Sequence, residues 1–146
     1  MKRQSQDIRN KERLRRKYRP APVKILFVGE APPASGRFFY QADSGLYRAF
    51  RNTFQIVFSA LRDADFLESF REMGCYLVDL CGKPVDRLNN SERRKTCLGG
   101  EVRLSRILKE LHPQIVIVVV RSIVPNVRRS IEKAGWKGQL LELPYP

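Results

Sequence analysis

Cysteine and histidine are scarce in this 146-residue sequence, which has three cysteines and one histidine. Cys75, Cys81 and Cys97 lie far apart and form no CxxC pair. An odd number of cysteines without metal-ligand spacing argues against both a disulfide framework and a zinc site. We therefore expect reduced, mostly buried thiols and no bound metal.

Long hydrophobic runs are also missing. The longest, at 115–120, suits a buried strand and is far too short to cross a bilayer. The first residues are charged, so the sequence shows no secretory signal. We expect an intracellular, cytoplasmic protein that does not bind membranes.

Acidic residues are few: 15 Asp and Glu stand against 28 Lys and Arg, which gives a formal net charge of +13. Such a surplus attracts polyanions, because each contacted phosphate releases condensed counterions. Basic proteins also bind ribosomes, RNA and acidic lipids. The charge therefore indicates a class of partner, and nucleic acid is the first candidate.

The basic residues are concentrated at the start of the chain. Nine of them lie in residues 1–19, among them Arg15, Arg16 and Lys17, with too few aliphatic side chains for a core-facing stripe. Pro20 and Pro22 follow and break any helix. We expect residues 1–22 to form a basic arm that becomes helical on a polyanion, and residues 23–146 to form one α/β domain.

Four apolar runs predict strands, at 24–29, 75–80, 115–120 and 138–143. The segments between them have helical periodicity: about 46–61, 65–73, a region that starts near Ser91 and is interrupted at Gly99-Gly100, and 121–134. This alternation predicts parallel strands joined by right-handed crossovers, with helices on both faces. The fold class is α/β, a three-layer α/β/α sandwich with a four-stranded parallel sheet.

Open parallel sheets hold their sites beyond the carboxyl ends of the strands. Glu30 and Asp79 follow the first two strands, so we expect both carboxylates at one edge of the sheet. Arg121-Ser122 and the segment around Tyr145 follow the other two. A carboxylate there can activate water or stabilise a developing cation. A helix cap or a solvated strand end is the alternative.

The loop after the first strand contains Phe38, Phe39 and Tyr40 between Arg37 and Ser44. Aromatic rings beside a basic residue suit stacking on a nucleobase. Core packing beneath a long loop is the alternative for at least one of the three rings.

These segments resemble the uracil-DNA glycosylase superfamily. Residues 25–32, ILFVGEAP, look like its first motif in the GEAPG-bearing branches, and residues 36–40, GRFFY, look like its G-R-P-F-V segment. Residues 76–79 lie where the family has a strand ending in Asn, and residues 111–118 resemble its third strand. The resemblance covers about 23–143 and implies an enzyme that hydrolyses the base–sugar bond of a flipped nucleotide.

Carried over by this resemblance, Glu30 orients or activates the attacking water and Phe39 stacks on the base. The backbone of Gly29 and Ala31 lines the base pocket. The expected base-binding residues are Gly29, Ala31, Phe39, Asp79 and Tyr145. The expected nucleic-acid contacts are Arg15, Arg16, Lys17, Arg37, Ser44, Lys83, Arg87, Arg121 and Ser122. The expected partner is DNA, single- or double-stranded, bound by a monomer.

The sequence departs from the family pattern at three points. Asp79 replaces the Asn that reads uracil, and an ionised carboxylate only accepts hydrogen bonds. We therefore expect the base preference to be shifted away from uracil, and we expect Asp79→Asn to improve uracil release. The closing His-Pro-Ser motif is not found after the fourth strand: either the chain is a shortened member or Tyr145 partly substitutes. His112 precedes the third strand and has a structural role. The iron–sulfur cysteines of some branches are absent, so no cofactor is expected.

Three further interpretations stay open. The chain could be a nucleic-acid-binding protein that keeps the glycosylase fold without catalysis. It could act on a small nucleotide or nucleoside, because a fold does not fix the substrate. Glu30 and Asp79 could also work as an acid–base pair across the glycosidic bond.

Overall fold

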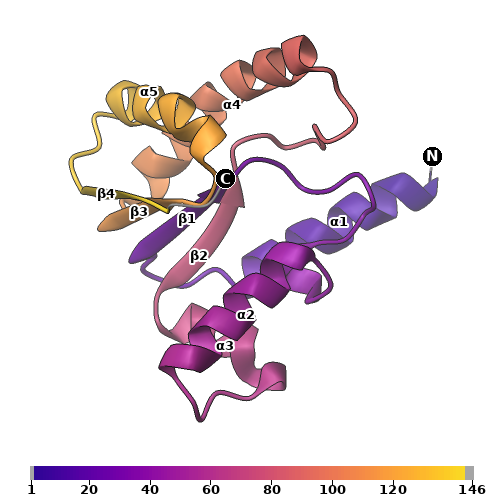
Figure 1. Ribbon diagram of the computed structural model, residues 1–146, viewed down its shortest axis with the longest axis vertical. Coiled ribbons are helices and arrows are strands. Elements are labelled where there is room, and N and C mark those ends of the chain that lie inside the picture. The colour runs from indigo at the N-terminus through magenta and orange to yellow at the C-terminus, as the bar shows by residue number, and fades with distance from the viewer. Residues whose placement is uncertain (1, 144–146) are drawn as a thin grey trace.

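Four parallel strands form the centre of the molecule (Figure 1). The computed structural model describes residues 2–143, with β1 (Ile25–Gly29), β2 (Cys75–Asp79), β3 (Ile115–Val118) and β4 (Gln139–Glu142). The strands lie in the order β2-β1-β3-β4, and each neighbouring pair is parallel. The predicted four-stranded parallel sheet is confirmed.

Helices cover both faces of this sheet. Figure 1 shows α4 (Asn90–Leu111) and α5 (Val124–Ala134) on one side, and α1 (Lys2–Lys17), α2 (Gly45–Val57) and α3 (Phe66–Glu72) on the other. Three short 3-10 turns complete the fold: η1 (Phe39–Gln41), η2 (Asp63–Asp65) and η3 (Arg121–Ile123). The three-layer α/β/α sandwich is therefore as predicted. None of the helices in residues 2–143 combines the length and the apolar character that a membrane span requires.

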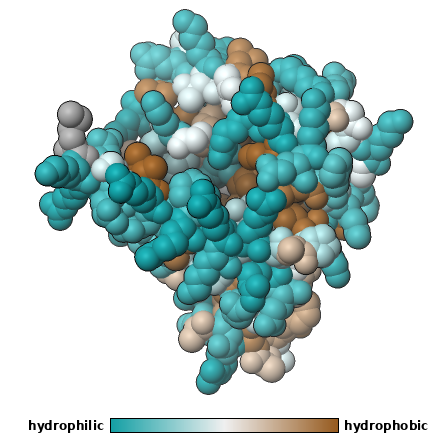
Figure 2. Space-filling view, turned by 180° about the vertical axis from the view of Figure 1, so that it is seen from behind, coloured by the Kyte–Doolittle hydropathy of each residue, from teal (hydrophilic) through white to brown (hydrophobic). Residues whose placement is uncertain are grey.

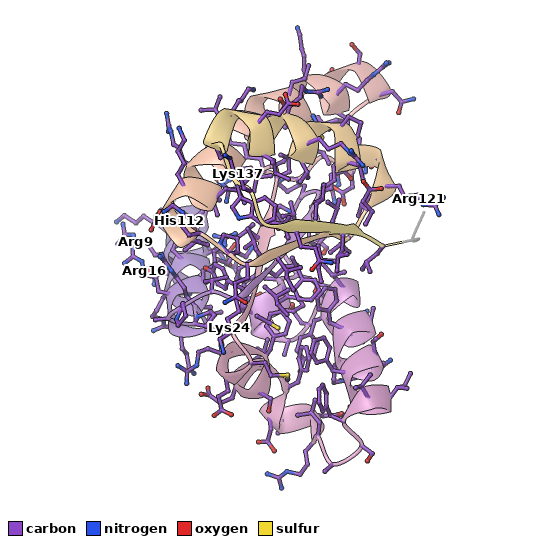
Figure 3. The ribbon with its side chains drawn as sticks, turned by 90° about the vertical axis from the view of Figure 1, so that its left-hand side faces the viewer. Arg9, Arg16, Lys24, His112, Arg121 and Lys137 are labelled. Carbon is purple, nitrogen blue, oxygen red and sulfur yellow. The ribbon has the colours of Figure 1, made fainter. Side chains whose placement is uncertain are left out.

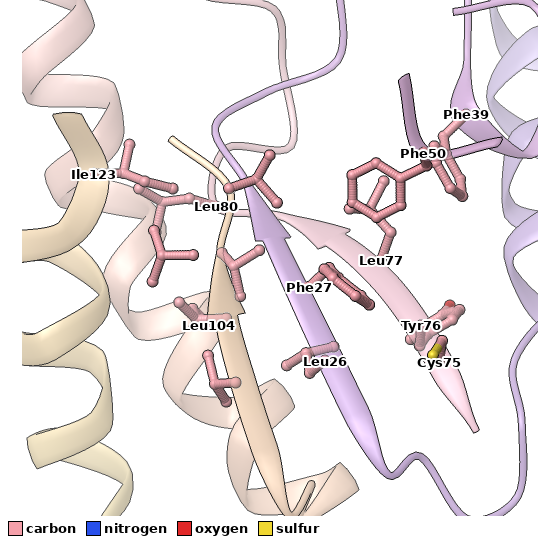
Figure 4. Close-up of a cluster of buried hydrophobic side chains, with 14 of the residues drawn as sticks. Leu26, Phe27, Phe39, Phe50, Cys75, Tyr76, Leu77, Leu80, Leu104 and Ile123 are labelled. Carbon is pink, nitrogen blue, oxygen red and sulfur yellow. The ribbon is translucent and has the colours of Figure 1, made fainter. Parts of the chain in front are cut away.

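The core has two halves, one on each face of the sheet (Figure 4). On one face, the Phe27 ring of β1 meets the Phe50 ring of α2 edge to face, with 4.9 Å between centroids. On the other, Leu104 of α4 and Ile123 lie near Leu80 and are almost completely buried. Burial of apolar surface on both faces is the main force that holds the layers together.

Helix α4 differs from the prediction at two points. It begins at Asn90, one residue before the predicted start near Ser91, and the Asn89 side chain caps it by accepting a hydrogen bond from the Glu92 amide, so Ser91 is not its cap. It also runs without a break through Gly99-Gly100. A Cβ atom on Gly100 would lie 2.3 Å from the Leu80 backbone oxygen. Gly100 therefore permits close packing of α4 on the end of β2, and it does not interrupt the helix.

The N-terminal segment is helical in the structure. Residues 2–17 form α1, and the end of this helix packs on the domain. Tyr18, directly after α1, stacks on Tyr40 with 5.9 Å between ring centroids, and the Tyr76 hydroxyl donates a hydrogen bond to the Arg15 carbonyl. The segment is thus attached to the body by its last turn.

In Figure 2, which shows the molecule from behind, hydrophilic side chains cover most of the face.

Candidate functional site

A cavity of about 290 Å³ opens at the carboxyl edge of the sheet, where β1 and β2 end. We call it the first cavity; its wall includes Arg15, Glu30, Phe38, Phe39, Asp79 and Arg93. Its volume lies at the small end of the range for ligand pockets in proteins. The prediction that Glu30 and Asp79 converge on one edge is confirmed, because both side chains line this cavity.

Glu30 lies directly after β1, and its side chain is only 13% exposed. Arg93, in the first turn of α4, donates hydrogen bonds to both carboxylate oxygens: its Nε lies 2.9 Å from Oε2, and one of its terminal nitrogens contacts Oε1. This bidentate pairing fixes the orientation of the Glu30 carboxylate. The sequence analysis did not identify Arg93. Its position, a cation in the first turn of the helix that follows the β2 loop, would have indicated a residue near the carboxyl edge of the sheet.

Asp79 is the last residue of β2 and pairs in register with Gly29 of β1. A Cβ atom on Gly29 would lie 2.7 Å from Asp79 Oδ1, so a larger residue there would displace this carboxyl group. Burial raises the pKa of Asp79 to about 6; the cations Arg15 and Arg103 oppose that rise, and the Glu30 carboxylate adds to it. Asp79 therefore titrates close to neutral pH.

The three aromatic residues of the loop are all buried, with 3–4% of each exposed. The Tyr40 hydroxyl donates to the Leu77 carbonyl at 2.9 Å and accepts from the Leu77 amide at 2.8 Å, which ties the loop to the edge strand β2. Phe39 makes edge-to-face contacts with Tyr47 and Phe50. Core packing thus holds all three rings, while Phe38, Phe39 and Tyr40 also line the first cavity.

Arg15 brings α1 to the first cavity. Its guanidinium lies over the Phe38 ring, 4.7 Å from the centroid, and its side chain is 24% exposed. A half-buried cation above an aromatic ring combines an ionic contact with a flat surface. Arg15 is therefore the residue of the basic segment that reaches the cavity, whereas Arg16 and Lys17 are exposed outside it.

Most of the other predicted nucleic-acid contacts lie at the surface of the molecule. Arg37, Lys83, Arg87, Arg121 and Ser122 are exposed. Figure 3 shows Arg121 on the opposite side of the molecule from Arg9, Arg16 and His112.

Ser44 is 5% exposed and lies in the wall of the first cavity, where it caps α2 by accepting a hydrogen bond from the Tyr47 amide. Tyr145 lies outside the described residues.

The backbone around Glu30 follows the sequence expectation only in part. Ala31 lines the first cavity beside Glu30, whereas Gly29 is buried at the end of β1 and is not part of the cavity wall. His112 ends α4 in a left-handed backbone conformation just before β3. It therefore lies at the amino edge of the sheet, away from the first cavity, as predicted.

The three cysteines are free and buried. The sulfur atoms of Cys81 and Cys97 lie 3.6 Å apart, and Cys97 Sγ lies 3.8 Å from Glu30 Oε2. Burial raises the pKa of Cys81 to about 12. Within residues 2–143 no group of three or more His, Cys, Asp or Glu side chains has the geometry of a metal site.

No protein-family model matches the sequence, and no curated protein sequence matches it.

Proposed function

We propose that this chain is a DNA glycosylase-like hydrolase of the uracil-DNA glycosylase type, acting on a flipped uracil or another deaminated or modified base. One observation carries the proposal: the carboxylates of Glu30 and Asp79 and the ring of Phe39 line a single small cavity at the carboxyl edge of the sheet. A net charge of +13 supports DNA as the substrate.

The size and lining of the first cavity suit one base. Its volume of about 290 Å³ has room for a single nucleobase, and Phe38 and Phe39 provide an aromatic wall. Extruding a base from a duplex costs a few kcal/mol, and least where the base is mismatched or already unpaired. Arg15, above Phe38, adds a cation that attracts the strand.

In the proposed reaction, water attacks the sugar carbon C1′ as the C–N bond to the base breaks. The bonding electron pair leaves with the base, and Glu30 accepts a proton from the attacking water. The departing base takes up one proton. Asp79 can supply it, because a carboxyl group whose pKa is about 6 still carries a proton in part of the molecules near neutral pH.

The protonation state of Asp79 also bears on which base is bound. When ionised, Asp79 only accepts hydrogen bonds and favours bases that present N–H or amino groups. When protonated, it offers one donor and one acceptor, as an asparagine amide does. We therefore expect uracil to be processed better below pH 6 than above it.

The test uses oligonucleotides that contain uracil, hypoxanthine, xanthine or no lesion, with abasic-site formation as the readout. Glu30→Gln should lower the rate on the order of 10²- to 10⁴-fold, the usual contribution of a general base. Glu132→Gln, an exposed residue of α5, makes the same change of charge away from the cavity and should have the wild-type rate. An equal rate in Glu30→Gln and wild type would overturn this role.

A second function is favoured by the pairing of Glu30 with Arg93. Both oxygens of this carboxylate already accept hydrogen bonds from a guanidinium, which suits a protein that binds nucleic acid without cleaving it. Binding of every oligonucleotide with no abasic sites formed would support this second function over the first.

A further inference from the structure

A second cavity, of about 880 Å³, lies beside the first, between the start of α4 and the segment that leads from β3 into α5. Its wall includes Glu30, Arg93, Arg94, Ser122, Asn126 and Arg129. Three arginines thus line it against one carboxylate, that of Glu30. Arginine is well suited to bind phosphate, because its planar group presents several N–H donors in a fixed geometry.

Glu30 and Arg93 line both cavities, so their ion pair separates the first cavity from the second. Arg93 uses its Nε and one terminal nitrogen on Glu30. The other terminal nitrogen makes no hydrogen bond to residues 2–143, and the Arg93 side chain is 42% exposed. One edge of the guanidinium therefore holds the carboxylate while the rest of the group can accept an anion as partner.

The two remaining arginines have different surroundings. Arg94 is exposed, and its only hydrogen bond within the described chain goes to the Asn90 carbonyl of its own helix, at 3.4 Å. Arg129 is held by buried Glu101, which accepts hydrogen bonds from its Nε at 2.9 and 3.1 Å. Arg94 thus carries an unneutralised charge at the cavity wall, and Arg129 is fixed in place there.

We infer that the second cavity binds a phosphodiester group of the DNA strand whose base occupies the first cavity, and that Arg93 bridges this phosphate and Glu30. The inference rests on the proposed function. Arg93 is then a positioning residue: the phosphate it binds sets the place of the sugar relative to the carboxylate. Arg94 adds a second ionic contact to the same phosphate or its neighbour.

The test measures binding of a short single-stranded oligothymidylate to the full chain over a range of salt concentrations. Each phosphate contact contributes about 0.7 to the slope of log affinity against log salt for single strands. Arg94→Gln and Arg93→Gln should each lower the slope by about 0.7, and Arg93→Lys, which keeps the charge, should restore it. Arg106→Gln is the matched control, because it removes an exposed arginine of α4 that does not line the second cavity.

Loss of Arg93 leaves Glu30 without its cation and could disturb folding. Arg94→Gln does not have this effect, because Arg94 has no acidic partner within residues 2–143, so it separates loss of binding from loss of folding. Wild-type slopes in both glutamine variants would overturn the inference and leave the proposed function standing. Absence of any oligothymidylate binding by the wild-type protein would overturn both. Inorganic phosphate that competes equally with the wild type and with Arg94→Gln would also overturn the inference.

Discussion

Asp79 should make the stability of this protein depend on pH in a way that a single substitution removes. Burial at the end of β2 raises the pKa of this carboxyl from its ordinary 3.8 to about 6. Below pH 3.8 the group is protonated in both the folded and the unfolded chain, so folding costs nothing extra. As pH rises from 3.8 to about 6, the carboxyl ionises in the unfolded chain before it ionises in the folded one, so stability falls; above pH 6 the loss is complete, because the folded protein then carries the charge as well.

The size of this effect follows from the difference of about two pKa units. Each unit corresponds to about 1.4 kcal/mol, so the loss approaches about 3 kcal/mol at pH 7.5, and water at this half-buried group reduces it. Asp79→Asn keeps the shape of the side chain and removes the charge. We expect the variant to be more stable than wild type by about 1–3 kcal/mol at pH 7.5 and no more stable than wild type at pH 3.5.

Urea unfolding of both proteins at a series of pH values measures this difference directly. Asp86→Asn is the matched control, because Asp86 lines the same cavity from an exposed loop position. The difference between Asp79→Asn and wild type should change more between pH 3.5 and 7.5 than the difference between Asp86→Asn and wild type does. A constant difference between Asp79→Asn and wild type over the same range would refute the argument from burial.

Two further predictions concern the framework of the site. Gly99→Ala should stabilise the protein by about 0.5–1 kcal/mol, because alanine is the better helix former and a Cβ atom there meets nothing within 4 Å. Gly100→Ala should destabilise it by about 1–3 kcal/mol, because its Cβ would overlap the Leu80 carbonyl. Thermal unfolding of both variants checks the two signs, and equal shifts in melting temperature would contradict the packing of α4 on Leu80. Tyr40→Phe should lower the free energy of unfolding by about 1–3 kcal/mol, because it leaves two buried backbone groups of Leu77 without partners. Urea unfolding identical to that of wild type would instead show that water replaces the hydroxyl group.

The sequence predicted the sheet and the meeting of its two carboxylates for one physical reason. In a parallel sheet every strand ends at the same edge, so residues that directly follow the strands lie along that edge. Glu30 and Asp79 lie close together there because β1 and β2 are also neighbours in the sheet. The buried position of the aromatic loop was partly predictable too, because rings under a long loop bury apolar area wherever they can.

The partners of those carboxylates could not be predicted in the same way. Arg93 and Glu30 are 63 positions apart, and their contact depends on the rotation of α4 about its axis and on where that helix begins. Because the sequence predicted a break at Gly99-Gly100, the rotation of this helix could not be predicted from the apolar residues that follow the break. Helix propensity disfavours two adjacent glycines, but the close approach of α4 to Leu80 requires one of them.

The two carboxylates of the first cavity have different surroundings. Glu30 has a bidentate guanidinium partner at 13% exposure, which holds it in one orientation toward the cavity. Asp79 lacks such a partner among the described residues: Arg103 donates to its backbone oxygen and not to its carboxyl. Burial dominates there and keeps a proton available near neutral pH. One group is oriented by a cation and the other retains a proton in part of the molecules. These surroundings support the proposed hydrolysis, in which Glu30 takes up a proton and Asp79 releases one.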